Sequence, residues 1–130
     1  MEVIEVIENK KAYIELLLLA DEQEEMIDRY LDKGKMYVVD DNGIKCECVV
    51  TDMGNGVLEI KNIATLPEYQ GKGYAKVMID FIIKKYREEY SILQVGTGDS
   101  PLTIPFYEKC GFVRSHIILN FFTDNYNHPI

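Results

Sequence analysis

Alternation of apolar and polar positions in the middle of the chain predicts three strands joined by tight turns. The strands are expected at residues 36–39, 44–51 and 57–65. An Asn-Gly pair at 42–43 separates the first two and accepts the positive φ that a two-residue hairpin needs. A second turn, Met-Gly-Asn-Gly at 53–56, precedes the third strand. Consecutive strands with such short connections form an antiparallel meander.

Helical spacing of apolar residues predicts helices on both sides of this meander. Upstream, the expected elements are a strand at 3–7, a helix at 10–20, and a second helix that an Asp21–Glu24 capping box begins and Gly34 ends. Downstream, they are a helix at 73–90, a strand at 92–95, a helix at 103–110 and a strand at 112–120. The strand–helix–strand unit at 57–97 implies parallel pairing through a right-handed crossover. The pattern predicts one α/β (α+β) domain over residues 1–130, with a mixed, mostly antiparallel sheet flanked by helices.

Composition and charge narrow the function classes. Hydrophobic residues make up 47% of the 130-residue chain, enough for a core, and the formal net charge is −8. Such acidity argues against a nucleic-acid partner, which needs a basic surface. The longest apolar run, at 16–20, is too short to span a membrane, and the N-terminus lacks a targeting pattern. We therefore expect a cytoplasmic protein without a membrane partner.

The three cysteines favour a reducing compartment, because their number is odd and no signal peptide precedes them. Cys46 and Cys48 would share one face of a strand as small core residues. Both histidines lie far along the chain, at 116 and 128, so no metal-ligand spacing is present and no metal is expected.

The segment from Gln70 to Ala75 lies between an apolar strand and a long helix. Gly71 and Gly73 allow backbone N–H groups to approach an anion closely, and the helix N-terminus adds free N–H groups with partial positive charge. These features predict a pyrophosphate site. A P-loop is excluded because the Gly-Lys-Ser/Thr ending is absent, and a dinucleotide fold is disfavoured because an antiparallel meander precedes the loop. By itself, the loop could also be a simple strand–helix turn.

Two segments resemble the signatures of the GNAT superfamily of acyl-CoA N-acyltransferases. Gln70-x-x-Gly73-x-Ala75 resembles its Arg/Gln-x-x-Gly-x-Gly/Ala motif. The segment Phe106-Tyr107-Glu108-Lys109-Cys110-Gly111-Phe112 resembles its aromatic-Tyr-x-x-x-Gly-Phe motif. A helix and a strand separate the two, as in the family, and the similar layout extends over about residues 35–119. The resemblance implies an acetyl-CoA-dependent N-acetyltransferase with a cofactor cleft between the fourth and fifth strands.

The resemblance also implies roles for residues of this chain. The strand end Ile63-Ala64-Thr65 would pair with the pantetheine arm of coenzyme A and hold the acetyl carbonyl. Tyr107 would be the general acid toward the leaving thiolate, with Phe106 packed on the cofactor side or in the core. Ser100 stands where many relatives have an Asn that contacts pantetheine. The residues that would bind the pyrophosphate are Gln70, Gly71, Lys72, Gly73, Tyr74 and Ala75.

Glu59 is the candidate base, since it precedes Gln70 by 11 residues, where some relatives carry a catalytic Glu. The alternative is that Glu59 points to solvent or pairs with Lys61, because strand faces alternate. Asn62 could orient the acceptor or a water. The acceptor is expected to be a primary amine, such as a polyamine, an aminoglycoside or a peptide amine. The alternative function is a non-catalytic acyl-CoA sensor or regulatory domain on the same fold.

The C-terminal segment differs from the pattern that the resemblance implies. Most relatives finish with a further strand, and none is readable at the end of this chain. We therefore expect the final strand of the sheet to be missing, either through truncation or because a neighbouring subunit covers the exposed edge. Phe121, Phe122 and Tyr126 would then suit a homodimer contact or a substrate lid.

Overall fold

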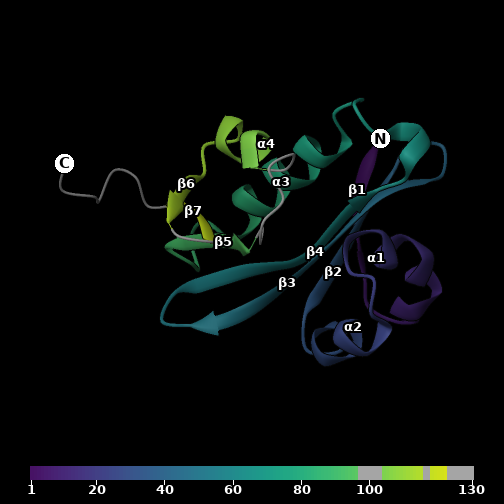
Figure 1. Ribbon diagram of the computed structural model, residues 1–130, viewed down its shortest axis with the longest axis horizontal. Helices are drawn as coiled ribbons and strands as arrows, with labels where there is room; N and C mark the ends of the chain where they lie inside the picture. The colour runs from purple at the N-terminus through teal and green to yellow at the C-terminus, as the bar shows by residue number, and fades with distance from the viewer. Residues whose placement is uncertain (97–103, 116–117, 123–130) are drawn as a thin grey trace.

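The computed structural model describes residues 1–96, 104–115 and 118–122 of the chain. Its sheet has seven strands in the order β1-β2-β3-β4-β5-β7-β6, with helices on both faces (Figure 1). The strands are β1 Glu2–Val6, β2 Lys35–Asp40, β3 Ile44–Gly54, β4 Val57–Thr65, β5 Ile92–Gly96, β6 Val113–Ser115 and β7 Ile118–Phe122. The helices are α1 Ile14–Ala20, α2 Glu24–Leu31, α3 Tyr74–Tyr86 and α4 Ile104–Lys109, with short 3₁₀ helices at Lys10–Tyr13 and Pro67–Tyr69.

The strand pairings confirm the predicted meander and crossover. β2, β3 and β4 pair antiparallel in sequence order, and β4 pairs parallel with β5 through α3. The bounds of β4 match the prediction, whereas α3 ends at Tyr86, four residues before the predicted end at 90. Within the described residues, no helix has the length and apolar character needed to cross a membrane.

The predicted capping box of the second helix is wrong. α2 begins at Glu24 after Gln23, and no side chain caps it. Asp21 instead follows the end of α1 in extended conformation, where its Oδ1 accepts the Gln23 N–H at 3.3 Å. The Asp21 carboxylate thus stabilises the turn between the two helices. Short polar side chains form hydrogen bonds with nearby backbone groups both in turns and at helix N-termini.

The expectation that the final strand is missing is also wrong. The stretch predicted as one strand at 112–120 is divided into β6 and β7, which pair antiparallel with each other. β7 also pairs with β5, so it lies inside the sheet and β6 forms its edge. No Gly, Pro or Asn stands between the two strands, so the sequence carries no local signal that divides them. Phe121, predicted as part of an exposed aromatic tail, packs against the core.

Two cores lie on opposite faces of the sheet (Figure 1). One lies under α1 and α2 and includes Leu17 and Ile27. The other lies under α3 and α4 and includes Met78, Ile82 and Tyr107. Side chains alternate along each strand and so contribute to both cores. Each polar side chain of the central strands therefore lies on either the α1–α2 face or the α3–α4 face.

β4 carries one extra residue opposite β3. Val49 stands opposite Asn62 whereas Val50 stands opposite Ile60, which makes Lys61 the bulged residue. Ile60 packs in the core under α3, while Asn62 Nδ2 donates to a carbonyl oxygen of α1 at 3.0 Å. Without the bulge, the two-residue period would place Ile60 and Asn62 on the same face. The bulge therefore turns Asn62 toward α1 and α2.

Candidate functional site

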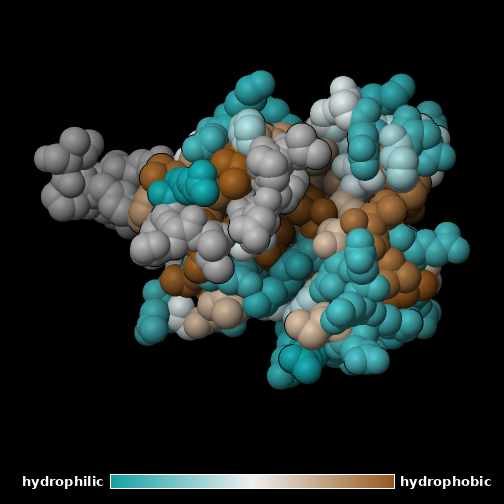
Figure 2. Space-filling model, viewed as in Figure 1, coloured by the Kyte–Doolittle hydropathy of each residue, from teal (hydrophilic) through white to brown (hydrophobic). Residues whose placement is uncertain are grey.

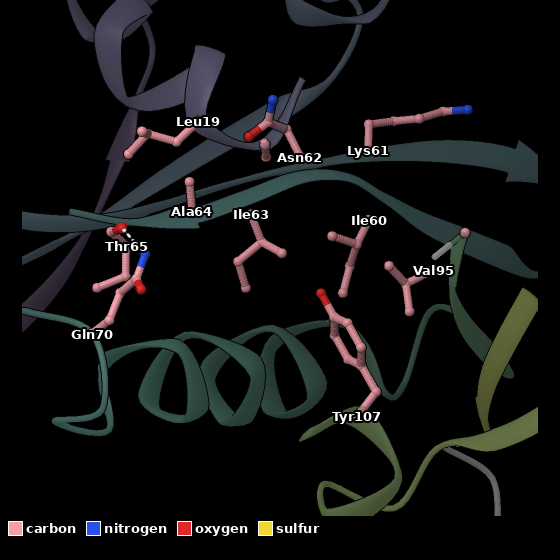
Figure 3. Close-up of a pocket in the computed structure, with 12 residues that line it drawn as sticks. Leu19, Ile60, Lys61, Asn62, Ile63, Ala64, Thr65, Gln70, Val95 and Tyr107 are labelled. Carbon is pink, nitrogen blue, oxygen red and sulfur yellow. Dashed lines mark hydrogen bonds between the residues drawn. The ribbon is translucent and has the colours of Figure 1, made fainter. Parts of the chain in front are cut away.

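The cleft predicted between the fourth and fifth strands is present. β4 and β5 pair only from Val57 and Ile92 to Ile60 and Val95, and among the described residues no strand pairs with β4 on that side beyond Ile60. A cavity of about 530 Å³ occupies the opening (Figure 3). Its lining residues are Leu19, Ala20, Ile60, Lys61, Asn62, Ile63, Ala64, Thr65, Gln70, Val95, Gly96 and Tyr107.

The edge of β4 supplies backbone groups to this cavity. Ile63, Ala64 and Thr65 follow one another along it in extended conformation (Figure 3). An extended chain can add to such an edge through main-chain hydrogen bonds. Gln70 Nε2 donates to the Thr65 carbonyl oxygen at 3.3 Å, so the side chain of Gln70 ties the glycine loop to the end of the strand.

The glycine loop leaves a group of backbone donors unused. Gly71 and Gly73 have φ values of 80° and 89°, in the left-handed region that favours glycine. No heavy atom lies within 4 Å of where a Cβ would stand at either position, so both face open space. Among the described backbone contacts at the start of α3, Val77 N–H is the first to reach a carbonyl, that of Gly73 at 3.0 Å. The preceding N–H groups therefore have no carbonyl partner among the described residues and are available for an anion.

The β2–β3 turn and the start of β3 brace this loop from outside. The Tyr74 hydroxyl donates to Asp41 Oδ2 at 2.7 Å, and the Lys45 ammonium lies 4.3 Å from the centre of the Tyr69 ring. The Leu66 N–H also donates to the carbonyl oxygen of Lys45 at 3.0 Å. The Tyr74 side chain is thus engaged with the turn, and only its backbone N–H remains for a phosphate. Lys72 is exposed and Ala75 half-buried beside it.

Tyr107 reaches the cavity from the side of α4. Its ring packs edge-on against Phe106 and Phe112, with centroid distances of 5.2 and 5.4 Å. Its hydroxyl points into the cavity toward Ile60 and Ile63 (Figure 3). Burial raises the pKa of this hydroxyl, and the neighbouring Cys48 and Cys110 raise it further. The phenol therefore stays protonated at neutral pH, as a proton donor must.

Glu59 lies outside the cavity lining and is already paired. Gln94 Nε2 donates to its Oε1 at 2.5 Å, and the Lys61 ammonium lies 2.5 Å from its Oε2. The alternative that Glu59 pairs with Lys61 is therefore confirmed, and its role as a base stays a prediction. Lys61 itself lines the cavity, which the sequence reasoning missed because the bulge that places it there has no sequence signal.

Asn62 does line the cavity, as expected of a substrate-side residue. Its Nδ2 donates to the Leu17 carbonyl oxygen and to the Tyr30 hydroxyl, both at 3.0 Å. Its Oδ1 is buried and has no partner among the described residues. The wall formed by Leu19 and Ala20 of α1 was not predicted, since only packing places the end of α1 over β4. Ser100 lies outside the described residues.

A second buried acceptor, Glu47 of β3, lies on the same face of the sheet. It is fully buried, and neither carboxylate oxygen has a partner among the described residues. It stands opposite Ala64, a lining residue of the cavity, and beside Val38. Burial raises the pKa of its carboxyl well above the ordinary value of 4.5, because desolvation penalises the charged form.

Similarity to known proteins agrees with this geometry. The family model described as "Acetyltransferase (GNAT) domain" matches residues 32–114. An uncharacterised N-acetyltransferase, YvbK, of Bacillus subtilis (strain 168) is 32% identical over 119 residues, which are 89% of this chain and 77% of that protein. The chain therefore belongs to the GNAT family and is an acetyltransferase of that family.

Solved structures share the whole fold. A GNAT family acetyltransferase from Elizabethkingia anophelis with acetyl-CoA bound has a TM-score of 0.83 and 26% identity, over 93% of this chain and 97% of that one. An IAA acetyltransferase from Bacillus cereus ATCC 14579 has a TM-score of 0.81 and 28% identity, over 93% and 99%. A Bacillus subtilis acetyltransferase in complex with CoA, at 24% identity and a TM-score of 0.81 over 93% and 97%, shares the fold.

Proposed function

We propose that this protein transfers the acetyl group of acetyl-CoA directly to a primary amine. The observation that carries the proposal is that one cavity joins the unpaired edge of β4 and the Tyr107 hydroxyl, with Gln70 bringing the glycine loop to its rim. The relative from Elizabethkingia anophelis binds acetyl-CoA, and the Bacillus subtilis structure holds CoA. Both support the choice of acyl donor.

The residues present fit coenzyme A. The free N–H groups from Gly71 to the first turn of α3 suit its pyrophosphate, and the braced loop keeps them oriented. The backbone of Ile63, Ala64 and Thr65 suits the amides of the pantetheine arm, which bond to a strand edge as another strand would. Acetyl-CoA supplies a thioester whose acyl carbon is the electrophile.

Tyr107 and the polar side chains of β4 would divide the proton transfers. Only the neutral amine has a free lone pair, and alkyl amines are mostly protonated at neutral pH. Glu59 is the proposed proton acceptor. Because strand residues rise about 3.3 Å each, it lies on the order of 10 Å along the strand from Ile63 and would act through water. As the carbon–sulfur bond breaks, Tyr107 would donate its proton to the thiolate sulfur.

The first test is acetyl-CoA binding by calorimetry, followed by release of free thiol with a panel of primary amines. We expect binding and amine-dependent release, and we expect Tyr107→Phe to retain binding while kcat falls roughly 100-fold or more. Binding without release for any amine, with Tyr107→Phe indistinguishable from wild type, would favour the acyl-CoA sensor. No binding at millimolar acetyl-CoA would contradict both functions.

A further inference from the structure

A second cavity, of about 380 Å³, adjoins the first on the α1–α2 side of the sheet. It lies between α2 and the outer parts of β3 and β4. Lys61 lines both cavities, and the Tyr30 hydroxyl, on the wall of the second, accepts a hydrogen bond at 3.0 Å from Asn62, on the wall of the first. The two cavities therefore share a wall, formed by Lys61 and by the Asn62–Tyr30 hydrogen bond.

Cations converge on this second cavity. The chain has 14 basic and 22 acidic residues, yet Arg29, Lys33 and Lys61 all line one small space. Within the part of the chain that the structure describes, Arg29 and Lys33 form no ion pair. Lys61 is paired with Glu59 on its own strand. Among the described residues, the lining thus presents two cations without an ion-pair partner, Arg29 and Lys33, and a third, Lys61, that is paired with Glu59.

The carboxylate of Asp52, the acidic residue of this lining, points away from the three cations. It stands opposite Leu58, whose side chain packs in the core under α3, so Asp52 shares that face and not the α1–α2 face. Its Oδ1 accepts the Gly54 N–H at 2.7 Å. Burial, and then a hydrogen bond with Asp52, raise the pKa of Tyr90 on the α3 side. The carboxylate therefore leaves the cations of the cavity unneutralised.

Among the described residues, none of the acidic side chains of α2 forms an ion pair with Arg29, Lys33 or Lys61. Glu24 and Asp28 both pair with Lys11, at 2.5 and 2.6 Å. Arg29 in the last turn of α2 is favoured by the helix dipole, but that effect does not explain why Lys33 and Lys61 converge on the same space. Figure 2 shows apolar surface in the hollow between the α1–α2 half and the rest of the molecule, with polar surface over α2.

We propose that the second cavity binds a carboxylate of the acceptor, so that the substrate is an amino carboxylate and not a polyamine. The inference rests on the proposed function, because the amine must be acetylated in the first cavity. The carboxylate would lie among Arg29, Lys33 and Lys61, and the thioether side chains of Met26 and Met53 would contact the carbon chain between the two charged ends. A diamine would instead place an ammonium beside these cations, which is repulsive.

The strand spacing sets the length of this acceptor. Lys61 and Ile63 lie two residues apart on β4, on the order of 7 Å along the strand, and the Lys61 side chain extends away from Ile63 (Figure 3). The amine and the carboxylate must therefore be separated by several bonds. Straight-chain ω-amino carboxylates and the side-chain amine of lysine meet this requirement, whereas the α-amine of a short amino acid does not.

The test compares straight-chain ω-amino carboxylates with diamines and unsubstituted amines of the same chain length, in the acetyl-CoA thiol-release assay. We expect kcat/KM for the amino carboxylate to exceed that for the diamine by about tenfold, the sum of several partly exposed ion pairs. Arg29→Glu/Lys33→Glu should reverse this order. Lys84→Glu/Arg87→Glu, an equal charge change on the exposed side of α3 and its C-terminal flank, should leave it unchanged.

A wild-type preference for the diamine or the unsubstituted amine would overturn the proposal, as would equal selectivity in both double variants. If acetyl-CoA binds but no amine releases thiol, the proposed function fails and the carboxylate subsite is tested by calorimetry on the CoA complex. Binding of the ω-amino carboxylate that Arg29→Glu/Lys33→Glu abolishes would still support the subsite, and absence of binding would refute it. Acetyl-CoA titration of each variant checks that it is folded.

Discussion

Replacing Glu47 with glutamine should stabilise the protein, and increasingly so as the pH rises. The folded state holds the carboxyl of Glu47 buried without a partner, so its pKa is raised well above 4.5. In the unfolded chain the same group ionises near its ordinary value. Between these two pKa values the unfolded state releases a proton that the folded state retains, so the free energy of unfolding falls as pH increases.

The size of this effect follows from the pH interval. Each pH unit above the ordinary value of 4.5 costs about 1.4 kcal/mol while the folded carboxyl stays protonated. A folded carboxyl that stays protonated up to pH 7 therefore costs about 3 kcal/mol at that pH. Glutamine has a similar shape and does not titrate, so Glu47→Gln removes the whole pH-dependent part of this cost.

Urea unfolding measures the difference in the free energy of unfolding between wild type and Glu47→Gln, at intervals of about one pH unit from about pH 4 to about pH 8. We expect the two proteins to differ least at pH 4 and the variant to gain stability steadily above it. Glu25→Gln, which removes an exposed carboxylate of α2, is the matched control and should show no such trend. A difference between Glu47→Gln and wild type that stays constant with pH would refute the reasoning.

Three further changes test the cleft. Gly73→Ala places a Cβ on a residue with φ 89°, so we expect acetyl-CoA to bind about five- to tenfold more weakly in calorimetry; unchanged affinity would show that the loop does not bind the pyrophosphate in this conformation. Tyr74→Phe removes the hydrogen bond to Asp41, and KM for acetyl-CoA should rise about two- to fivefold with kcat unchanged; a fall in kcat alone would argue against a bracing role. Glu59→Gln should lower kcat about 100-fold while acetyl-CoA binding stays unchanged; an unchanged kcat would assign the base elsewhere.

The sequence predicted the parts of this fold that depend on local signals. The meander followed from two glycine-containing turns, and the cofactor loop followed from Gly71 and Gly73 at the start of a helix. Both features are determined by backbone conformations that few residues adopt. The cleft itself came from the resemblance, since nothing local in β4 or β5 indicates where their pairing stops.

The features that the sequence predicted wrongly or did not predict share one cause, which is tertiary contact without a local marker. The bulge at Lys61 changes which face Asn62 occupies, and strand alternation counted along the sequence cannot detect an extra residue. No Gly, Pro or Asn separates β6 from β7 in the sequence, so the pattern predicts one strand where the structure has two. Aspartate is a residue type that often caps helices, yet Asp21 lies in the turn between α1 and α2, where it accepts the Gln23 N–H.

The central claim is that the cavity beside β4 transfers an acetyl group directly from acetyl-CoA to an amine. Its most direct test is mass spectrometry of acceptor and protein after incubation with acetyl-CoA that carries an isotope-labelled acetyl group. We predict that the label appears on the amine nitrogen, at a rate that Tyr107→Phe reduces, and that the protein stays unlabelled. Label on Cys110, or bound acetyl-CoA with every amine unlabelled, would contradict the account.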